Sequence, residues 1–140
     1  MRCTRHRTTR LLLAGQLALL PIAAWSQGAE SPAAATITVR LSNFSFDPAQ
    51  IRLRAGVAVR LQLVNESGGG HNFSAPGFFA ASKFPAAHAP PGGVVEVPAR
   101  GSAEITVIPA VPGTYRVECT HFLHALFGMT GRIVVDAAPG

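Results

Sequence analysis

The sequence predicts an all-β fold class, a Greek-key β-sandwich of about seven to eight strands. Apolar and polar residues alternate with a period of two along much of the chain. Turn signals separate these stretches about every 8–12 residues, and no stretch has the spacing of an amphipathic helix. Because a strand points successive side chains to opposite faces, this pattern predicts two sheets that pack their apolar faces together.

Each predicted strand has one apolar face, and a turn motif ends it. The clearest strand lies in residues 57–63, where Val and Leu alternate with polar or small residues. Turns are predicted at Asp47-Pro48, Ala55-Gly56, 99–101 and Pro112-Gly113. The apolar faces are expected to consist, in chain order, of Ile37, Val39, Leu41, Phe44 and Phe46; Ile51 and Leu53; Val57, Val59, Leu61 and Leu63; Val95 and Val97; Ile105 and Val107; Tyr115, Val117 and Cys119; and Ile133 and Val135.

Residues 77–91 are the least regular part of the expected domain. Pro85, Pro90 and Pro91 exclude a long helix, although the stretch accommodates a single helical turn. His88 lies there and is expected to be exposed to solvent. The sequence assigns no function to this stretch.

Residues 1–26 have the three parts of a secretory signal peptide. Four arginines precede an apolar run at 11–24, and Ala24-Trp25-Ser26 forms a small-x-small cleavage site. The run of about 14 residues is shorter than the roughly 20 that a membrane-spanning helix needs, which favours cleavage over retention as an anchor. We therefore expect a periplasmic or secreted protein with no membrane association, a flexible segment at 27–35 and a folded domain at 36–137.

The charge of the chain resides mostly in this N-terminal segment. The formal net charge is +5, from 12 basic and 7 acidic residues. Four of the basic residues precede residue 27, so the mature chain carries about +1 and has no basic character that predicts nucleic-acid binding. The sequence also lacks a Ser-His-Asp set, a phosphate-binding loop and a paired acidic motif, so we expect no enzyme activity.

Cysteine usage points to a metal. The chain has two cysteines, and Cys3 would be removed with the signal peptide. Cys119 would then be a lone thiol in an oxidising compartment, where it has no partner for an intramolecular disulfide. Metal ligation would protect it, whereas the alternative interpretation is a small buried hydrophobic residue.

The stretch 119–129 concentrates metal ligands. It contains Cys119, His121, His124 and Met129, and one thiol, two imidazoles and a thioether suit copper better than zinc or a hard cation. His71 follows three glycines far upstream and is a further candidate ligand, or else a solvated loop histidine. Met129 has the alternative of filling the core. His121 would point away from Cys119 on an extended segment, so it is considered only as an extra ligand.

The pattern Tyr115-x3-Cys119-x4-His124-x4-Met129-x-Gly131-x-Ile133-x-Val135, with His71-Asn72 upstream, resembles the cupredoxin family of plastocyanin- and azurin-like blue copper proteins. The likeness covers nearly all of the mature chain. It implies one copper ion per chain, cycling between Cu(I) and Cu(II). The residues that it implies at the site are His71, Cys119 and His124 as trigonal ligands, Met129 as a weak axial ligand, and Asn72 as a brace for the Cys119 loop.

The resemblance implies a small carrier of single electrons between redox proteins, such as a cytochrome or a copper oxidase. The apolar residues 122–127 around His124 would either pack in the core or form a rim where such a partner docks weakly. Two alternatives remain. One is a periplasmic copper-handling protein for storage or delivery, although the mature chain lacks a Met- and His-rich cluster. The other is a non-blue copper site in which His121 is an extra ligand.

Overall fold

The computed structural model describes residues 34–85 and 89–138. The expected signal peptide at 1–26, nearly all of the expected flexible segment at 27–35, and His88 lie outside these residues. Within the described ranges, none of the helices combines the length and the apolar character needed to cross a membrane.

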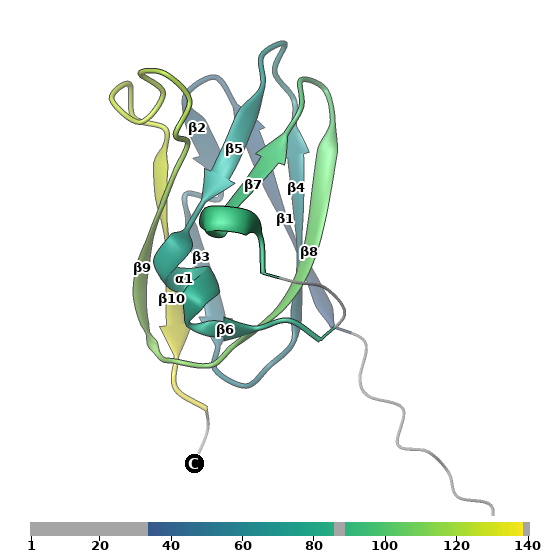
Figure 1. Ribbon diagram of the computed structural model, residues 1–140, viewed down its shortest axis with the longest axis vertical. Helices are drawn as coiled ribbons and strands as arrows, with labels where there is room; N and C mark the ends of the chain where they lie inside the picture. Colours follow the sequence, from purple (N-terminus) through teal and green to yellow (C-terminus); the bar gives the residue numbers. More distant parts are fainter. Residues whose placement is uncertain (1–33, 86–88, 139–140) are drawn as a thin grey trace, which may run out of the picture. The chain divides into compact units, whose positions relative to one another are not determined.

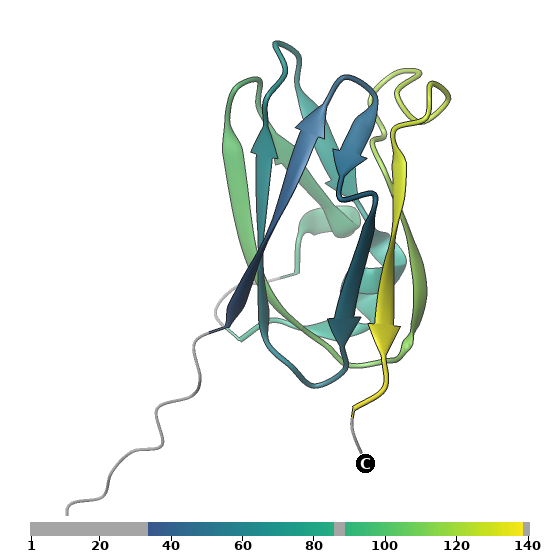
Figure 2. The same ribbon diagram turned by 180° about the vertical axis from the view of Figure 1, so that it is seen from behind.

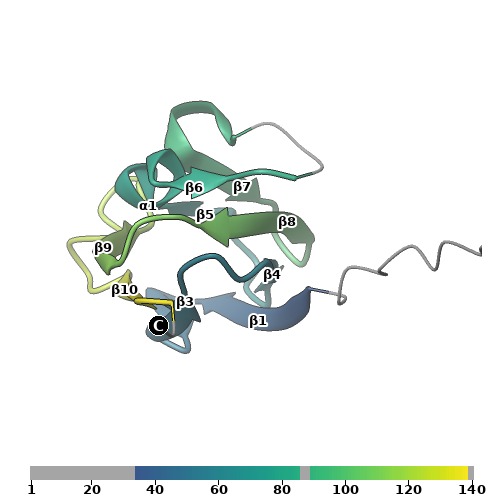
Figure 3. The same ribbon diagram turned by 90° about the horizontal axis from the view of Figure 1, so that it is seen from below.

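The described chain folds into two five-stranded sheets that face each other as a β-sandwich (Figures 1 and 3). This confirms the predicted fold class. The structure has more strands than expected: the hairpin separates β2 from the first expected strand, and the short strands β5 and β6, of four and two residues, were not predicted. In sheet order, the strands are β2 (Ser45–Asp47), β1 (Ala35–Ser42), β4 (Val59–Asn65), β8 (Ser102–Pro109) and β6 (Ser82–Lys83), and β3 (Gln50–Arg54), β10 (Thr130–Asp136), β9 (Gly113–Glu118), β5 (His71–Ser74) and β7 (Val94–Val97).

Two parallel pairings interrupt an otherwise antiparallel arrangement. β1 runs parallel to β4, with Val39 opposite Leu63, and β3 runs parallel to β10, with Ile51 opposite Ile133. β2 belongs to the first sheet and β3 to the second, so the chain crosses from one sheet to the other between them (Figure 2). Because β3 and β10 are far apart in the sequence, their pairing connects an early segment of the domain to its last strand.

The core lies between the sheets and takes alternate residues from their strands, as a period of two requires. Leu61 and Leu63 of β4 are fully buried, and Arg60 between the core positions of this strand is exposed. The ring of Phe73, on β5, packs against the rings of Phe46 and Phe79. Phe46 is on β2 of the other sheet, and Phe79 lies in the segment that follows β5, so Phe73 links all three. Other large, fully buried side chains are those of Phe78, Leu41, Met129, Ile133, Val39, Val97, Val107 and Val117.

Two residues expected on apolar strand faces are exposed instead. Phe44 does not continue the first strand, because β1 and β2 form a hairpin in which Ser42 pairs with Ser45. Phe44 is in the two-residue turn, with φ of 60°, and is 42% exposed. Val57 lies between β4 and a turn at Gly56, whose φ is 78°. Its side chain is 51% exposed. In both cases the turn replaces the extended backbone on which the period of two depends.

The irregular stretch contains the helical turn that its prolines permit. Helix α1 (Pro76–Ala80) begins with a proline at its first turn, where the missing N–H removes no intrahelical hydrogen bond. It buries Phe78 and Phe79, and the 3₁₀ turn η1 (Pro91–Gly93) lies next to it. Tyr115 packs against Phe78, and its hydroxyl donates a hydrogen bond of 2.8 Å to the carbonyl of Val111.

The strand order brings two distant segments together at one end of the second sheet. β5 and β9 are antiparallel neighbours, and Ser74 at the end of β5 lies opposite Glu118 at the end of β9. His71 and Asn72 at the start of β5 therefore lie beside the residues that follow β9. The loop at 119–129 leaves β9 at this same end of the sandwich and leads into β10 (Figure 1).

Candidate metal centre

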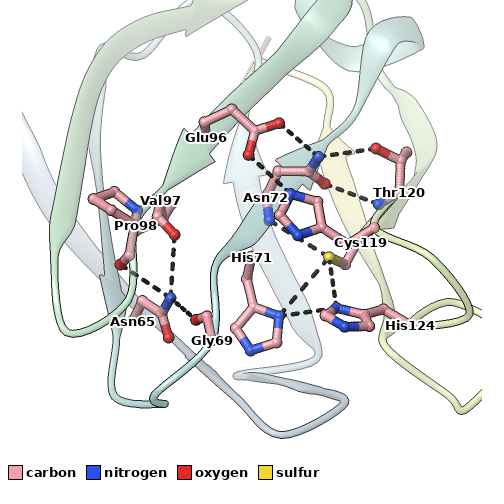
Figure 4. Close-up of polar contacts among 11 residues, drawn as sticks. Asn65, Gly69, His71, Asn72, Glu96, Val97, Pro98, Cys119, Thr120 and His124 are labelled. Atoms are coloured by element: carbon pink, nitrogen blue, oxygen red, sulfur yellow. Dashed lines mark hydrogen bonds and ion pairs between the residues drawn. The ribbon is translucent and has the colours of Figure 1, made fainter.

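Three ligand-type side chains converge at this end of the sandwich. The donor atoms of His71, Cys119 and His124 all lie within 4.8 Å of one another. The two Nδ1 atoms are 3.1 Å apart, and Cys119 Sγ lies 3.3 Å from Nδ1 of His124 and 3.9 Å from Nδ1 of His71 (Figure 4). His71 and Cys119 are buried, and His124 is partly exposed. Three of the four ligands that the sequence pattern selected are therefore brought together.

The spacing of these atoms fits one transition-metal ion. Donors that share an ion at about 2.0 Å for nitrogen and 2.3 Å for sulfur lie roughly 3 to 4 Å from one another. All three measured distances fall in this interval. Among the described residues, Nε2 of His71 is the one buried side-chain nitrogen or oxygen without a hydrogen-bond partner, and Nδ1 is the atom that faces the other donors.

The loop that follows Cys119 is closed by its own backbone. Met129 N–H donates to the carbonyl of His124 at 3.0 Å, and Cys119 N–H donates to the carbonyl of Met129 at 3.1 Å. These bonds place the start, middle and end of the loop side by side, and Met129 is fully buried. Leu123 and Gly128 have positive φ values of 63° and 100°, so the loop contains a conformation that is costly for a leucine.

A buried asparagine organises the loop that leads to His71. The Nδ2 atom of Asn65 lies 2.8 Å from the carbonyl oxygen of Gly69, 3.1 Å from that of Val97 and 3.0 Å from that of Pro98 (Figure 4). Its Oδ1 accepts hydrogen bonds from the N–H and the hydroxyl of Ser67. The end of β4, the glycine-rich loop and the end of β7 are thus fixed to one side chain. The sequence contained no signal for this role of Asn65.

Asn72 braces the cysteine segment, as the family resemblance implied. Its Oδ1 accepts the N–H of Thr120 at 2.9 Å, and its Nδ2 donates to the hydroxyl of Thr120 at 2.9 Å. Its backbone N–H points at Cys119 Sγ, at 3.5 Å. The side chain and the backbone of Asn72 therefore both contact the Cys119–Thr120 segment.

His121 lies outside the donor group, where it pairs with an acidic residue. Its Nε2 is 3.0 Å from Oε2 of Glu96, and its ring centroid is 5.6 Å from that of His124. Glu96 also accepts a hydrogen bond of 2.9 Å from Asn72. This bond holds the pKa of the Glu96 carboxyl below its usual range, against the effect of partial burial, and His121 adds to the lowering.

The environment of His71 favours the neutral form of its imidazole. Burial lowers the pKa of His71, and the neighbouring imidazoles of His124 and His121 lower it further through charge repulsion. A neutral imidazole offers an unprotonated nitrogen, which is the form that binds a metal.

Five exposed apolar side chains lie in the β1–β2 turn or close to His124 in the sequence, and we call them the apolar rim. Phe44 contacts the rings of both His124 and Phe127, with centroids 5.3 Å apart in each case. Between core packing and a surface rim, the exposures favour the rim. The exposed fractions are 42% for Phe44, 87% for Phe122, 42% for Leu123, 77% for Leu126 and 61% for Phe127.

A β-sandwich that gathers two histidines, a cysteine and a methionine at one end has the residue cluster typical of a type 1 copper site. The chain belongs to the cupredoxin-like domain family, whose family model matches residues 15–135. The resemblance inferred from the sequence is therefore confirmed.

Solved structures agree with this assignment. The chain is similar to auracyanin B, with a TM-score of 0.58 and 27% sequence identity, over 76% of this chain and 91% of that one. It also shares the fold of sodium-dithionite-reduced auracyanin from the photosynthetic bacterium Roseiflexus castenholzii, with a TM-score of 0.57 and 20% identity, over 76% and 98% of the two chains. A search of curated protein sequences found no match.

Proposed function

We propose that this protein is a mononuclear type 1 copper protein that carries single electrons between redox partners. The convergence of His71, Cys119 and His124 within 4.8 Å, two of them buried, is the observation on which the proposal rests. Met129, fully buried and bonded through its backbone to Cys119 and His124, is proposed as the axial ligand. Copper, when bound, supplies the one-electron couple between Cu(I) and Cu(II).

The protein's part is to hold the donors in one arrangement. His71 is anchored through the Asn65 cluster, and Cys119 through Asn72 and the backbone of Met129. Because these anchors lie on separate strands and loops, the donor atoms are restrained from several directions. A restrained donor set moves little when the bound ion gains or loses an electron, and this keeps electron exchange fast.

The apolar rim supports the idea of a docking surface for a redox partner. Of the three converging residues, His124 is the partly exposed one; Phe44 of the rim contacts its ring, and the other four rim residues are its near neighbours in the sequence. Monomeric proteins rarely expose such side chains together unless the surface binds something. We propose that a redox protein, such as a cytochrome or a copper oxidase, docks there weakly, and that the meeting takes place in the periplasm or outside the cell.

The first experiment is the visible spectrum of the protein without residues 1–26 after addition of one equivalent of Cu(II). An intense blue band is expected, because it arises from the bond between a cysteine sulfur and copper. The band should disappear in Cys119→Ser and persist in His121→Gln, which changes a nearby histidine outside the donor group. A wild-type protein that binds no Cu(II) would contradict the copper proposal. A wild-type protein that binds Cu(II) but gives only a pale colour, which changes in His121→Gln, would support the non-blue site.

Copper delivery is distinguished from electron transfer by retention of the metal. A carrier of electrons keeps its copper through repeated reduction with ascorbate and oxidation with ferricyanide. A delivery protein would release Cu(I) to a chelator such as bathocuproine disulfonate within the same cycle. We expect no release over several cycles, since hydrogen bonds restrain Cys119 from two directions: one from Asn72 to its sulfur and one from its own N–H to the backbone of Met129.

A further inference from the structure

Glu96 lies outside the proposed ligand set but connects three segments around it. It is on β7, directly opposite Asn72 of β5 in the strand register. One carboxylate oxygen accepts the hydrogen bond from Asn72 Nδ2 at 2.9 Å (Figure 4). The other carboxylate oxygen lies 3.0 Å from Nε2 of His121. Glu96 is thus the junction between β5, β7 and the loop after Cys119.

The contact with Glu96 determines which way the Asn72 amide points. A carboxylate accepts hydrogen bonds and donates none, so Nδ2 rather than Oδ1 must face it. Oδ1 is then left to accept the N–H of Thr120 at 2.9 Å, the bond that fixes the residue after Cys119. A rotated amide would set Oδ1 against the carboxylate of Glu96 and would leave the N–H of Thr120 facing another donor.

The Asn72 amide is nearly completely buried, so an error in its orientation would be costly. Asn72 is 2% exposed, and its Nδ2 group uses one contact for Glu96 and another for the hydroxyl of Thr120. Water therefore cannot readily replace either partner. The backbone N–H of the same residue points at Cys119 Sγ, so Asn72 contacts the cysteine segment through its backbone as well as its side chain.

We propose that Glu96 is a positioning residue of the metal centre: it orients the Asn72 amide so that Asn72 holds the Cys119–Thr120 segment, and its negative charge lowers the reduction potential. The proposal builds on the proposed function. The lowering follows because a nearby negative charge stabilises the more positive oxidised state. Since the Glu96 side chain is 65% exposed, the charge effect is screened and decreases as salt is added.

Two substitutions separate the orientation from the charge. Glu96→Gln keeps an oxygen that accepts from Asn72 but removes the charge, and Glu96→Ala removes both. Asp136→Asn is the matched control, because Asp136 is also an exposed carboxylate with a charged partner, Arg52. Asp136 is at the end of β10, and the site lies near the start of that strand at Thr130.

Amide hydrogen exchange of Thr120, followed by NMR in the metal-free protein, tests the orientation. We expect exchange to accelerate roughly tenfold or more in Glu96→Ala, since a hydrogen bond to a charged group is lost. In Glu96→Gln the rate should stay within about threefold of the wild type, because the acceptor is kept. Unchanged exchange in Glu96→Ala would overturn the positioning role, and this result does not depend on copper.

The reduction potential of the copper-loaded protein, measured at two salt concentrations, tests the charge. Glu96→Gln should raise the potential, more at low salt than at high salt, and Asp136→Asn should leave it unchanged. A shift in Glu96→Gln no larger than that of the control would overturn the charge effect. If the wild-type protein forms no copper centre, the proposed function fails instead, and the exchange experiment still decides the positioning role.

Discussion

The ring of Phe44 meets the ring of His124 nearly edge to face, with the centroids 5.3 Å apart and the planes at 88°. This contact joins the turn between β1 and β2, in the first sheet, to the loop that carries the ligands. The same phenylalanine contacts Phe127 across that loop. Phe44 therefore fastens the outer side of the loop, although it is itself 42% exposed and has a positive φ.

Replacing Phe44 with alanine should destabilise the protein moderately. Two aromatic contacts are lost, each with a contribution of about 0.5–1.5 kcal/mol beyond area burial, so we expect the free energy of unfolding to fall by roughly 1–3 kcal/mol. Chemical denaturation of the metal-free protein measures this change. Val57→Ala is the matched control, because Val57 is also exposed and next to a turn. Equal effects of the two substitutions would contradict the fastening role.

The apolar rim should govern encounter with a partner while contributing little to stability. Phe122 and Leu126 are 87% and 77% exposed, so replacing both with serine should change the free energy of unfolding by only about 0.5 kcal/mol each. The second-order rate of electron transfer with a soluble cytochrome c should fall roughly fivefold, in proportion to weakened docking. Stopped-flow mixing measures this rate.

The control for the rim is Val111→Ser, which changes an exposed apolar residue before β9, the strand whose other end leads to the site. It should leave the rate unaltered. A rate that is insensitive to both rim substitutions would place the docking surface elsewhere on the protein.

The strand periodicity was sufficient to predict the sandwich and the inward direction of Cys119. Tyr115, Val117 and Cys119 have the same parity on one extended segment, and the structure buries Val117 and Cys119. The spacing of Cys119, His124 and Met129 identifies the loop from the sequence alone. Signals of this kind are local, because alternation and spacing depend on residues close together in the chain.

Contacts between distant segments were not accessible to the same reasoning. Phe44 was expected in the core, yet a tight hairpin moves it to the surface beside His124. The contact of Glu96 with Asn72 depends on the register of β5 against β7, which no single strand pattern specifies. For Asn65, an asparagine next to a glycine-rich loop is unremarkable in sequence, and its partners at Val97 and Pro98 are visible only in the fold.

The metal-free protein should lose stability as the pH falls below about 6.5, the usual value for histidine. The pKa of His71 is lowered in the folded state by burial first and then by His124 and His121. Between the lowered value and the ordinary one, the unfolded chain binds more protons than the folded one, so stability rises with pH across this window. Urea denaturation at a series of pH values measures the slope.

The variant His71→Gln tests the origin of this slope, because glutamine does not titrate. Its stability should depend less steeply on pH just below 6.5 than that of the wild type. A slope that is identical in the two proteins would assign the acid sensitivity to other groups.

Asn65→Ala should be among the most damaging single substitutions outside the ligands. The change leaves the carbonyl oxygens of Gly69, Val97 and Pro98 without their common donor, and the Ser67 N–H without its acceptor. Since each unsatisfied buried group costs about 1–3 kcal/mol, and relaxation recovers part of the total, we expect a loss of roughly 2–4 kcal/mol in the free energy of unfolding. The glycine-rich loop would also hold His71 less firmly.

Copper titration distinguishes these two effects of Asn65→Ala. If the loop positions His71, the variant that remains folded at low temperature should bind Cu(II) more weakly and show a less intense blue band than the wild type. Thr38→Ala provides the control, since Thr38 is an exposed residue of β1 with a single side-chain hydrogen bond to Gln62. A destabilised Asn65→Ala protein with wild-type copper affinity would show that the Asn65 cluster supports the fold without positioning the ligand.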